Sequence, residues 1–411
     1  MDGPGSIPSL MLATVWQIVS HNWALTSILL TLVLLIVIPT LILLKYVRIC
    51  LNILRDSEPP LLMAPHGFVP LAGEEIDFYA TDGIRLHGTL VRAKTNQPRG
   101  LIVFAPEFKS DRRSCARYCR PLLDAGYDIF SFDFRGHGQS SSEEGYTPRQ
   151  WASDREVADM TGAIAFAEQW LDEQGRPIEL GLFGISRGAA SAILASEGCA
   201  SVKAIVSDSA FSSDCTLEHF MKRWAKIFAK VRVVYENHPP EFWRFLRWCV
   251  FLTCRFKFKC KFPSVRKTLT RMIPRPILFI HGKRDSHIPV EQSYLLYAQS
   301  AQPRYLWIVA RAKHNQSVDL EPEEYARRTV QFFDRFLAGR QDADNIFNTG
   351  RFESIARVEH AALSAASVSA SVVGATDAIT GGDRRADSPP LSHVVAIEQD
   401  RADKTDAHRD P

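Results

Sequence analysis

The feature that most constrains the fold is the pentapeptide Gly-Ile-Ser-Arg-Gly at residues 184–188, because of what stands on either side of it. An apolar run of strand length, Ile178–Phe183, leads into it, and a stretch rich in small residues, Arg187–Glu197, follows it. A sharp turn between a strand and a helix forces its central residue into a strained backbone, which is tolerable when small residues stand two positions before and after. The pattern therefore predicts a strand, a turn that exposes the Ser186 hydroxyl as a nucleophile, and a helix.

Segments of strand length alternate with helical windows on both sides of this turn. Glu74–Ala80 and Ile84–Ala93 flank the turn pair Asp82-Gly83 and predict an antiparallel hairpin. The further predicted strands are Gly100–Ala105, Tyr127–Asp133, Ile178–Phe183, Val202–Ser207, Pro276–His281 and Tyr305–Val309, and the predicted helices are Arg112–Ala125, Trp151–Glu173, Arg187–Glu197, Val290–Ala301 and Pro322–Leu337. This alternation is typical of an α/β fold, so we predict one domain over residues 74–340 with a mostly parallel sheet and helices on both faces.

A serine hydroxyl is a weak nucleophile and needs an adjacent base. In folds with this type of turn, the acid follows the serine along the chain and the histidine follows the acid. Asp285 and His314 each come just after a predicted strand, so we expect both at the carboxyl edge of the sheet, where Ser186 emerges. Asp285 would then orient the imidazole of His314. Asp208, at the end of another predicted strand, is the alternative acid.

The other histidines are interpreted as structural. His281 and His287 flank Asp285 and are expected to line the acid loop, and His137 is expected to brace a loop after its strand. The histidines of the sequence show no spacing typical of metal ligands. We therefore expect no metal and no organic cofactor.

Two backbone N–H donors are needed to bind the oxyanion that forms when a serine attacks a carbonyl. The residue after the nucleophile, Arg187, is expected to supply one of them. The second should come from the loop after Gly100–Ala105. Pro106 has no N–H, so Glu107 and Phe108 are the candidates, with Glu107 slightly preferred.

Four motifs carry a resemblance to a known family, namely GISRG at 184–188, FDFRGHGQS at 132–140, IHGKRDSHIP at 280–289 and AKHN at 312–315. On these motifs, residues 74–340 resemble an alpha/beta-hydrolase of the serine aminopeptidase-like group. With an apolar N-terminal segment, the arrangement is similar to the membrane-anchored alpha/beta-hydrolase-domain proteins, which include palmitoyl-protein thioesterases. Two positions depart from the usual pattern: Ala105-Pro106 replaces His-Gly in the oxyanion loop, and Arg187 stands where Met, Leu or Gln is commoner.

These residues predict a serine hydrolase that acts by acyl transfer. We expect it to cleave an ester or thioester through an acyl-enzyme, in a substrate that is a small acyl compound, a lipid or an acylated protein. An aminopeptidase-type amide hydrolase is the alternative activity, and a non-catalytic hydrolase-like scaffold tethered to the membrane is the alternative outside enzymes. A net charge of +3 is too small to indicate nucleic-acid binding.

The N-terminal part contains a long uncharged segment, Ala24–Leu44, after a flank of residues 1–23. As a helix it would span roughly 31 Å, close to the hydrocarbon thickness of about 30 Å, so we predict one transmembrane helix. A cleaved signal peptide is the alternative, but it would carry a basic region first, and the flank contains no Lys or Arg. Lys45, Arg48 and Arg55 follow the span, which predicts that the catalytic domain lies on the cytoplasmic side.

Residues 212–275 form a basic and aromatic segment at the place where this fold often carries a lid. The segment holds 15 Lys or Arg against four Asp or Glu, a net charge of +11. Three interpretations stay open: a lid that also lies on an anionic membrane surface, a solvated lid, and a surface that binds a partner. Of the remaining segments, residues 45–73 are predicted as a linker and the tail 341–411 as disordered. The eight cysteines are expected to be reduced.

Overall fold

The computed structural model describes residues 16, 23–56, 69–228 and 238–340. The tail that we predicted to be disordered, residues 341–411, lies outside the described residues. The same holds for almost all of the N-terminal flank and for part of the predicted linker.

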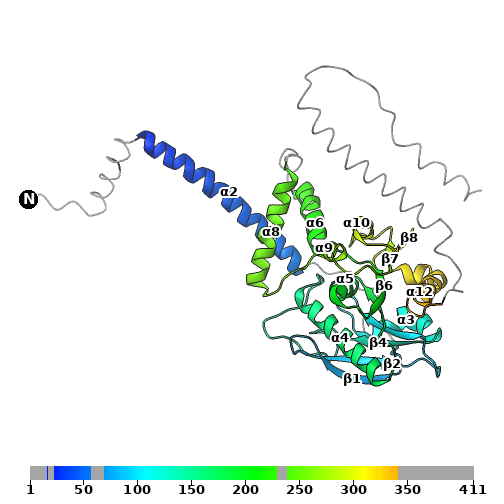
Figure 1. Cartoon of the computed structure of the whole chain (residues 1–411). Helices are drawn as coiled ribbons and strands as arrows, with labels where there is room; N and C mark the ends of the chain where they lie inside the picture. The colour runs from blue at the N-terminus through cyan, green and yellow to red at the C-terminus, as the bar shows by residue number, and fades with distance from the viewer. Residues whose placement is uncertain (1–15, 17–22, 57–68, 229–237, 341–411) are drawn as a thin grey trace, which may run out of the picture. The chain divides into compact units, whose positions relative to one another are not determined.

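One sheet of eight strands forms the centre of the described fold (Figure 1). The strands are β1 Glu74–Tyr79, β2 Arg85–Val91, β3 Gly100–Ala105, β4 Tyr127–Phe132, β5 Leu180–Ile185, β6 Val202–Asp208, β7 Ile277–Gly282 and β8 Arg304–Val309. Their order across the sheet is β1-β2-β4-β3-β5-β6-β7-β8. β2 pairs antiparallel with β1 and with β4, and all other pairings are parallel. The predicted hairpin and the mostly parallel sheet are confirmed.

Helices cover both faces of the sheet because its central strands are apolar on both sides. On β3, Leu101 and Val103 belong to one core, and Ile102 and Phe104 belong to another on the opposite face. The first face is covered by four helices, α4 Asp154–Glu173, α5 Arg187–Ala195, α9 Val265–Leu269 and α10 Glu291–Gln299. The second face is covered by α3 Cys115–Asp124 and α12 Pro322–Phe336, and the short helix α11 Ser317–Leu320 precedes α12. This is the α/β architecture that the sequence predicts.

The helix predicted to begin at Trp151 begins at Asp154 instead. Ser153 caps it, since the Ser153 hydroxyl accepts a backbone N–H of the first turn and the Glu156 carboxylate accepts the Ser153 N–H at 2.9 Å. Trp151 remains outside the helix, with its indole edge-on to Phe211. Side-chain capping, and not apolar spacing, sets where this helix starts.

Between β6 and β7 lies an insertion, residues 212–275, whose described parts, 212–228 and 238–275, are largely helical. Its helices include α6 Ser213–Phe228 and α8 Pro240–Lys257, and α9 closes the segment. Buried residues of α6 and α8, among them Leu217, Trp243 and Val250, build a third core that is separate from the two cores of the sheet.

α2, Trp23–Asp56, is the one helix within the described ranges that is long and apolar enough to cross a membrane. The mean hydropathy of its most apolar window is 2.9, and its large apolar side chains from Leu25 to Leu41 are exposed. A signal sequence near the N-terminus meets the same test of length and apolar composition. The helix is therefore a candidate membrane span on these two properties.

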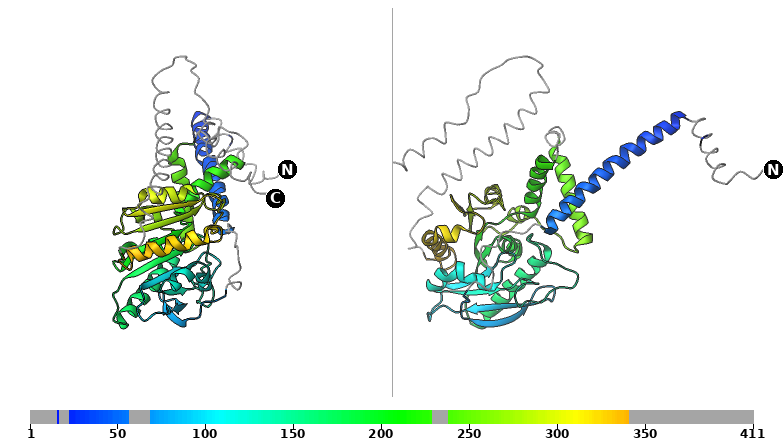
Figure 2. Two further views of the ribbon diagram at one scale, coloured as in Figure 1. Left: turned by 90° about the vertical axis from the view of Figure 1, so that its right-hand side faces the viewer. Right: turned by 180° about the vertical axis from the view of Figure 1, so that it is seen from behind.

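The helix continues past Leu44 into the segment that we predicted as a linker, and residues 45–56 are helical. The physical reason is a buried apolar stripe with helical spacing, which consists of Val47, Cys50, Leu51 and Leu54 and packs into the third core beside α8. Figures 1 and 2 show α2 in blue and α8 in green lying next to each other at this end. The predicted linker 45–73 is thus corrected at its start.

Candidate active site

Ser186 stands at a sharp turn between β5 and α5. Its backbone has φ +52° and ψ −113°, which is strained for a residue with a side chain. The turn needs both neighbouring glycines: a Cβ at Gly184 would lie 2.5 Å from Ala189 Cα, and a Cβ at Gly188 would lie 2.2 Å from the Ala105 carbonyl oxygen. The first turn of α5 therefore packs directly on the end of β3.

His314 and Asp285 continue a chain of hydrogen bonds that begins at Ser186. Ser186 Oγ lies 3.0 Å from His314 Nε2, and His314 Nδ1 lies 2.6 Å from Asp285 Oδ2. The three residues follow β5, β8 and β7, so each comes from a different loop at the carboxyl edge of the sheet. Ser186 is 4% exposed and His314 2% exposed. The structure thus brings together the three residues singled out in the sequence.

Asp285 is surrounded by donors. Its Oδ1 accepts the backbone N–H groups of His287 and Ile288, each at 2.8 Å, and its Oδ2 lies 3.3 Å from His281 Nε2 in addition to His314. Burial alone would raise the pKa of Asp285, but hydrogen bonds from His281 and His314 outweigh burial and hold this pKa well below its usual range. A carboxylate that stays ionised keeps the His314 proton on Nδ1 and leaves Nε2 free to accept one.

Asp208, the alternative acid, has other partners. Its carboxylate accepts the hydroxyl hydrogens of Tyr325, at 2.9 Å, and Ser209, at 2.8 Å. Burial raises the pKa of Asp208. The Asp208 backbone carbonyl accepts the N–H of Ser186 at 2.8 Å. Of the two candidate acids, Asp285 alone is hydrogen-bonded to His314, and Asp208 supports the backbone of the turn.

His281 and His287 lie in and beside the acid loop. His281 is buried, and its Nδ1 lies 2.7 Å from Ser293 Oγ. His287 Nε2 lies 2.6 Å from Gln150 Oε1, and its ring is edge-on to His314 with centroids 5.1 Å apart. Burial lowers the pKa of His287 to about 4, and His314 adds to this effect, so the His287 ring is neutral at pH 7.

His137 connects two loops of the site. Its Nδ1 lies 3.0 Å from the Arg135 carbonyl oxygen, and its Nε2 accepts the backbone N–H of Lys109 at 3.3 Å. Its ring also stands edge-on to Phe108. The expected brace is therefore present, and it reaches farther than the sequence indicates, because it ties the loop after β4 to the loop after β3.

Residues 96–239 match the family model described as serine aminopeptidase, S33. The matched part contains β3, β4, β5 and the turn at Ser186. Over this part the chain is similar to that family, and its sheet and helices have the arrangement of the alpha/beta-hydrolase fold. Asp285 and His314 lie beyond the matched part, so their assignment to the site rests on the geometry given above.

Two known proteins illustrate what this chain is similar to. YqkD of Bacillus subtilis is 28% identical over 221 residues, which cover 53% of this chain and 65% of YqkD, slightly less than two thirds. YfhR of Escherichia coli strain K12 is 24% identical over 274 residues, which cover 65% of this chain and 82% of YfhR. Among solved structures, an esterase of Pyrococcus furiosus has a TM-score of 0.48 and 22% identity, over 68% of this chain and 98% of the esterase.

Arg187 has a role that the sequence did not reveal. Its side chain is fully buried, with the guanidinium 4.9 Å from the ring centroids of both Phe108 and Phe134. Nη1 donates to the Arg149 carbonyl at 3.0 Å, and the Glu156 carboxylate lies 3.6 Å away. The sequence shows an unusual charged residue directly after the nucleophile, but it does not indicate what the guanidinium contacts. Arg187 thus links the turn to the loop after β3.

Glu107 and Phe108, the candidate second oxyanion donors, lie in that loop. Ser114 Oγ donates to the Glu107 carboxyl at 3.3 Å, and burial raises the pKa of Glu107. The Phe108 ring lies under the guanidinium of Arg187. Both side chains are therefore anchored below the loop. Within the described ranges, no group of three or more His, Cys, Asp and Glu side chains is arranged to hold a metal ion, and the eight cysteines are free thiols.

Proposed function

We propose that this alpha/beta hydrolase is a membrane-anchored serine hydrolase that cleaves an ester or thioester bond in an acylated substrate. The observation that carries the proposal is the hydrogen-bond chain from Ser186 through His314 to Asp285, which begins on a strained turn. A nucleophile, a base and a group that orients the base are what acyl transfer to a serine requires.

In the acylation step, Ser186 Oγ attacks the substrate carbonyl carbon and His314 Nε2 accepts the hydroxyl proton. Asp285 stabilises the imidazolium that forms, because its depressed pKa keeps it negatively charged. The backbone N–H groups of Arg187 and of Glu107 or Phe108 bind the oxyanion. The leaving group then takes the proton from His314, and Ser186 remains acylated.

In the deacylation step, water attacks the acyl-enzyme. His314 takes a proton from this water, and a second oxyanion forms at the same backbone donors. Collapse of this intermediate releases the acid and returns the proton to Ser186 Oγ. The cycle as proposed uses these residues and water.

A reactive-serine probe tests the nucleophile directly. A fluorophosphonate should label the wild-type protein and leave Ser186→Ala unlabelled while the variant keeps its thermal unfolding midpoint. Turnover by Ser186→Ala should fall on the order of 10⁶-fold. Residual turnover above about a tenth of wild type would rule out this nucleophile, since such losses are far larger in other serine hydrolases. An unlabelled wild-type protein would instead favour the non-catalytic scaffold.

An aminopeptidase is the second candidate, because the matching family model is described as serine aminopeptidase. A free α-ammonium group on the substrate is disfavoured by the net charge of +11 on the insertion 212–275. A panel of acyl esters, acyl thioesters and aminoacyl amides distinguishes the two candidates. We expect hydrolysis of esters or thioesters, and faster hydrolysis of aminoacyl amides would favour the peptidase.

We also propose that residues 24–44 remain in the membrane with the catalytic domain on the cytoplasmic side. The support is the length and composition of α2 and the basic residues Lys45, Arg48 and Arg55 that follow the span. The protein should resist carbonate extraction from membranes, and protease added from the cytoplasmic side should digest the catalytic domain. A processed, soluble form that begins after the span would identify a signal sequence.

A further inference from the structure

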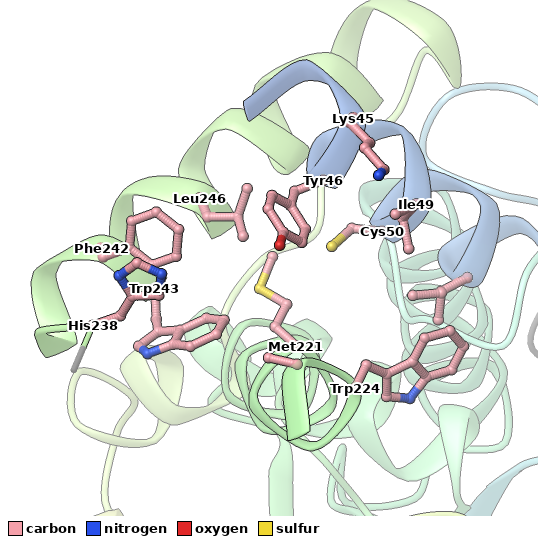
Figure 3. A pocket seen from close by; sticks show the side chains of 12 residues that line it. Lys45, Tyr46, Ile49, Cys50, Met221, Trp224, His238, Phe242, Trp243 and Leu246 are labelled. Atoms are coloured by element: carbon pink, nitrogen blue, oxygen red, sulfur yellow. The ribbon is translucent and has the colours of Figure 1, made fainter. Parts of the chain in front are cut away.

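A cavity of about 150 Å³ lies where α2 meets the helical insertion. Its walls come from α2, α6 and α8, and neither Ser186 nor His314 lines it. Figure 3 shows side chains of all three helices around this space, with Tyr46 and Ile49 from α2, Met221 and Trp224 from α6, and Leu246 from α8. The cavity is thus distinct from the candidate active site.

Most of the lining is apolar, and Lys45, Tyr46 and His238 supply its polar groups. Met221, Trp224, Trp243 and Leu246 present hydrocarbon, sulfur and ring surfaces to the cavity. The charged residue among the lining side chains is Lys45, at the start of this part of α2. A ligand that fits such walls gains dispersion contacts and loses hydrogen bonds to water, which favours a hydrocarbon chain over a polar molecule.

The place of the cavity along α2 points to the membrane as the source of that chain. Lys45 is the first charged residue after the uncharged segment 24–44, so the cavity begins where the proposed span ends. Ile49, one helical turn beyond Lys45, lines the cavity and is 36% exposed. This wall therefore lies at the headgroup level, next to the end of the proposed span.

α8 extends the apolar surface next to the cavity. Its inward face is buried, whereas Phe245, Trp248, Leu252 and Phe256 repeat at helical spacing on another face and are 50%, 58%, 39% and 75% exposed. Arg244, Arg255 and Lys257 are exposed on the same helix. A helix with an exposed aromatic stripe and basic residues beside it is typical of a membrane interface with anionic lipid.

We propose that the cavity between α2, α6 and α8 binds a short segment of one acyl chain of an anionic membrane phospholipid, with the headgroup beside Lys45. The chain comes from the leaflet that faces the catalytic domain, and the exposed stripe of α8 lies on that leaflet. The inference rests on the proposed membrane anchor but not on the proposed catalysis.

Photo-crosslinking tests the proposal on the full-length protein. The protein is placed in nanodiscs of phosphatidylcholine and phosphatidylserine that contain an ether-linked phosphatidylserine with a diazirine in one chain. The ether link cannot be hydrolysed, so the result does not depend on enzyme activity. We expect label on peptides that contain Met221 and Trp224, because α6 lies outside the proposed span. No label on α6, or label only from a diazirine placed on the headgroup, would overturn the proposal.

A cavity-filling variant provides the specificity test. Ala225→Trp places an indole in the cavity and should remove most of the α6 label, while label on residues 24–44 stays unchanged. Leu252→Trp, on the exposed stripe of α8, is the matched control and should keep the α6 label. If Ala225→Trp fails to fold, Ile49→Trp fills the same cavity from its exposed wall. Equal α6 label in the filled and control variants would contradict an acyl chain in this cavity.

Discussion

At the scale of single residues, the strained backbone of Ser186 is maintained by what surrounds it. The Ser186 N–H donates to Asp208, and two glycines allow α5 to approach β3. The strain costs on the order of 1–3 kcal/mol, and the packing of two buried sheet faces offsets it. The turn is therefore sensitive to any atom added between α5 and the end of β3.

Gly188→Ala tests this sensitivity. The added Cβ would lie 2.2 Å from the Ala105 carbonyl oxygen, which belongs to the backbone and has to move. We expect a loss of roughly 1–3 kcal/mol in the free energy of unfolding and a lower kcat, since the oxyanion loop shifts. Gly198→Ala is the control, because nothing lies within 4 Å of its added Cβ. Equal unfolding midpoints and equal kcat for the two variants would contradict the packing argument.

Replacing each candidate acid separates orientation of the base from support of the turn. Asp285→Asn removes the charge that holds His314 in its tautomer and should lower kcat about 10⁴-fold. Asp208→Asn keeps the backbone carbonyl that binds Ser186 and should lower kcat far less. Steady-state kinetics on the best substrate of the panel measure both effects. The reverse order of losses would place the catalytic acid on β6.

Burial of His287 predicts that the free energy of unfolding depends on pH. Its pKa is lowered to about 4 in the folded protein, whereas an unfolded histidine titrates near 6.5. Between these values the unfolded chain binds the extra proton, so this residue lowers stability as pH falls from about 6.5 to about 4, by on the order of 3 kcal/mol in total. His287→Gln can still donate a hydrogen bond to Gln150. This variant should lose less stability than the wild type between about pH 6.5 and pH 4. Unfolding midpoints at several pH values test this, and an unchanged slope would count against it.

At the scale of elements, α2 has two halves with different environments. The large apolar side chains from Leu25 to Ile42 are exposed, and the stripe formed by Val47, Cys50, Leu51 and Leu54 is buried against the insertion. The second half therefore belongs to the folded domain. The insertion in turn uses α2 to complete its own core.

Two truncations distinguish these halves. Removal of residues 1–45 keeps the buried stripe and should yield a soluble, active enzyme. Removal of residues 1–56 exposes the apolar surfaces of α6 and α8 and should cause aggregation or a lower unfolding midpoint. Size-exclusion chromatography and turnover compare the two proteins. Identical elution and turnover of the two proteins would show that residues 46–56 of α2 do not stabilise the domain.

At the scale of the whole molecule, charge is distributed unevenly. The insertion 212–275 carries +11 while the complete chain carries +3, so the remaining residues carry −8. The basic side is the one that α2 joins. An anionic leaflet therefore attracts the insertion and repels the rest of the chain.

Vesicle binding by the protein without residues 1–45 tests this distribution. Each basic residue near the surface contributes about 1 kcal/mol, and only a few of them face the bilayer at once, so a few kcal/mol is expected. Binding to anionic vesicles should exceed binding to neutral ones and should weaken as the Debye length falls from about 10 Å at 0.1 M salt to about 3 Å at 1 M. Trp248→Ser should reduce the vesicle binding that remains at high salt. Equal binding to both vesicle types at low salt would refute a membrane-facing insertion.

The sequence by itself determined most strands and helices of residues 74–340, the turn at Ser186, and the placement of His314 and two candidate acids, Asp285 and Asp208, at one edge of the sheet. These are encoded locally: apolar periodicity marks the elements, two glycines mark a backbone that few sequences tolerate, and parallel strands bring their carboxyl ends to one edge. A residue placed just after a strand could therefore be assigned to that edge before its neighbours were known.

Only the tertiary structure decided which carboxylate meets His314, where the guanidinium of Arg187 lies, and how far α2 continues as part of the domain. Ser186 and His314 are 128 residues apart in the chain, and the stripe of α2 meets partners in α6 and α8 that are farther away still. Periodicity shows that a face is apolar but not which surface covers it. Which surface covers an apolar face depends on the packing of elements that are distant in the chain. The local sequence does not show which of them will supply the partner of each buried group.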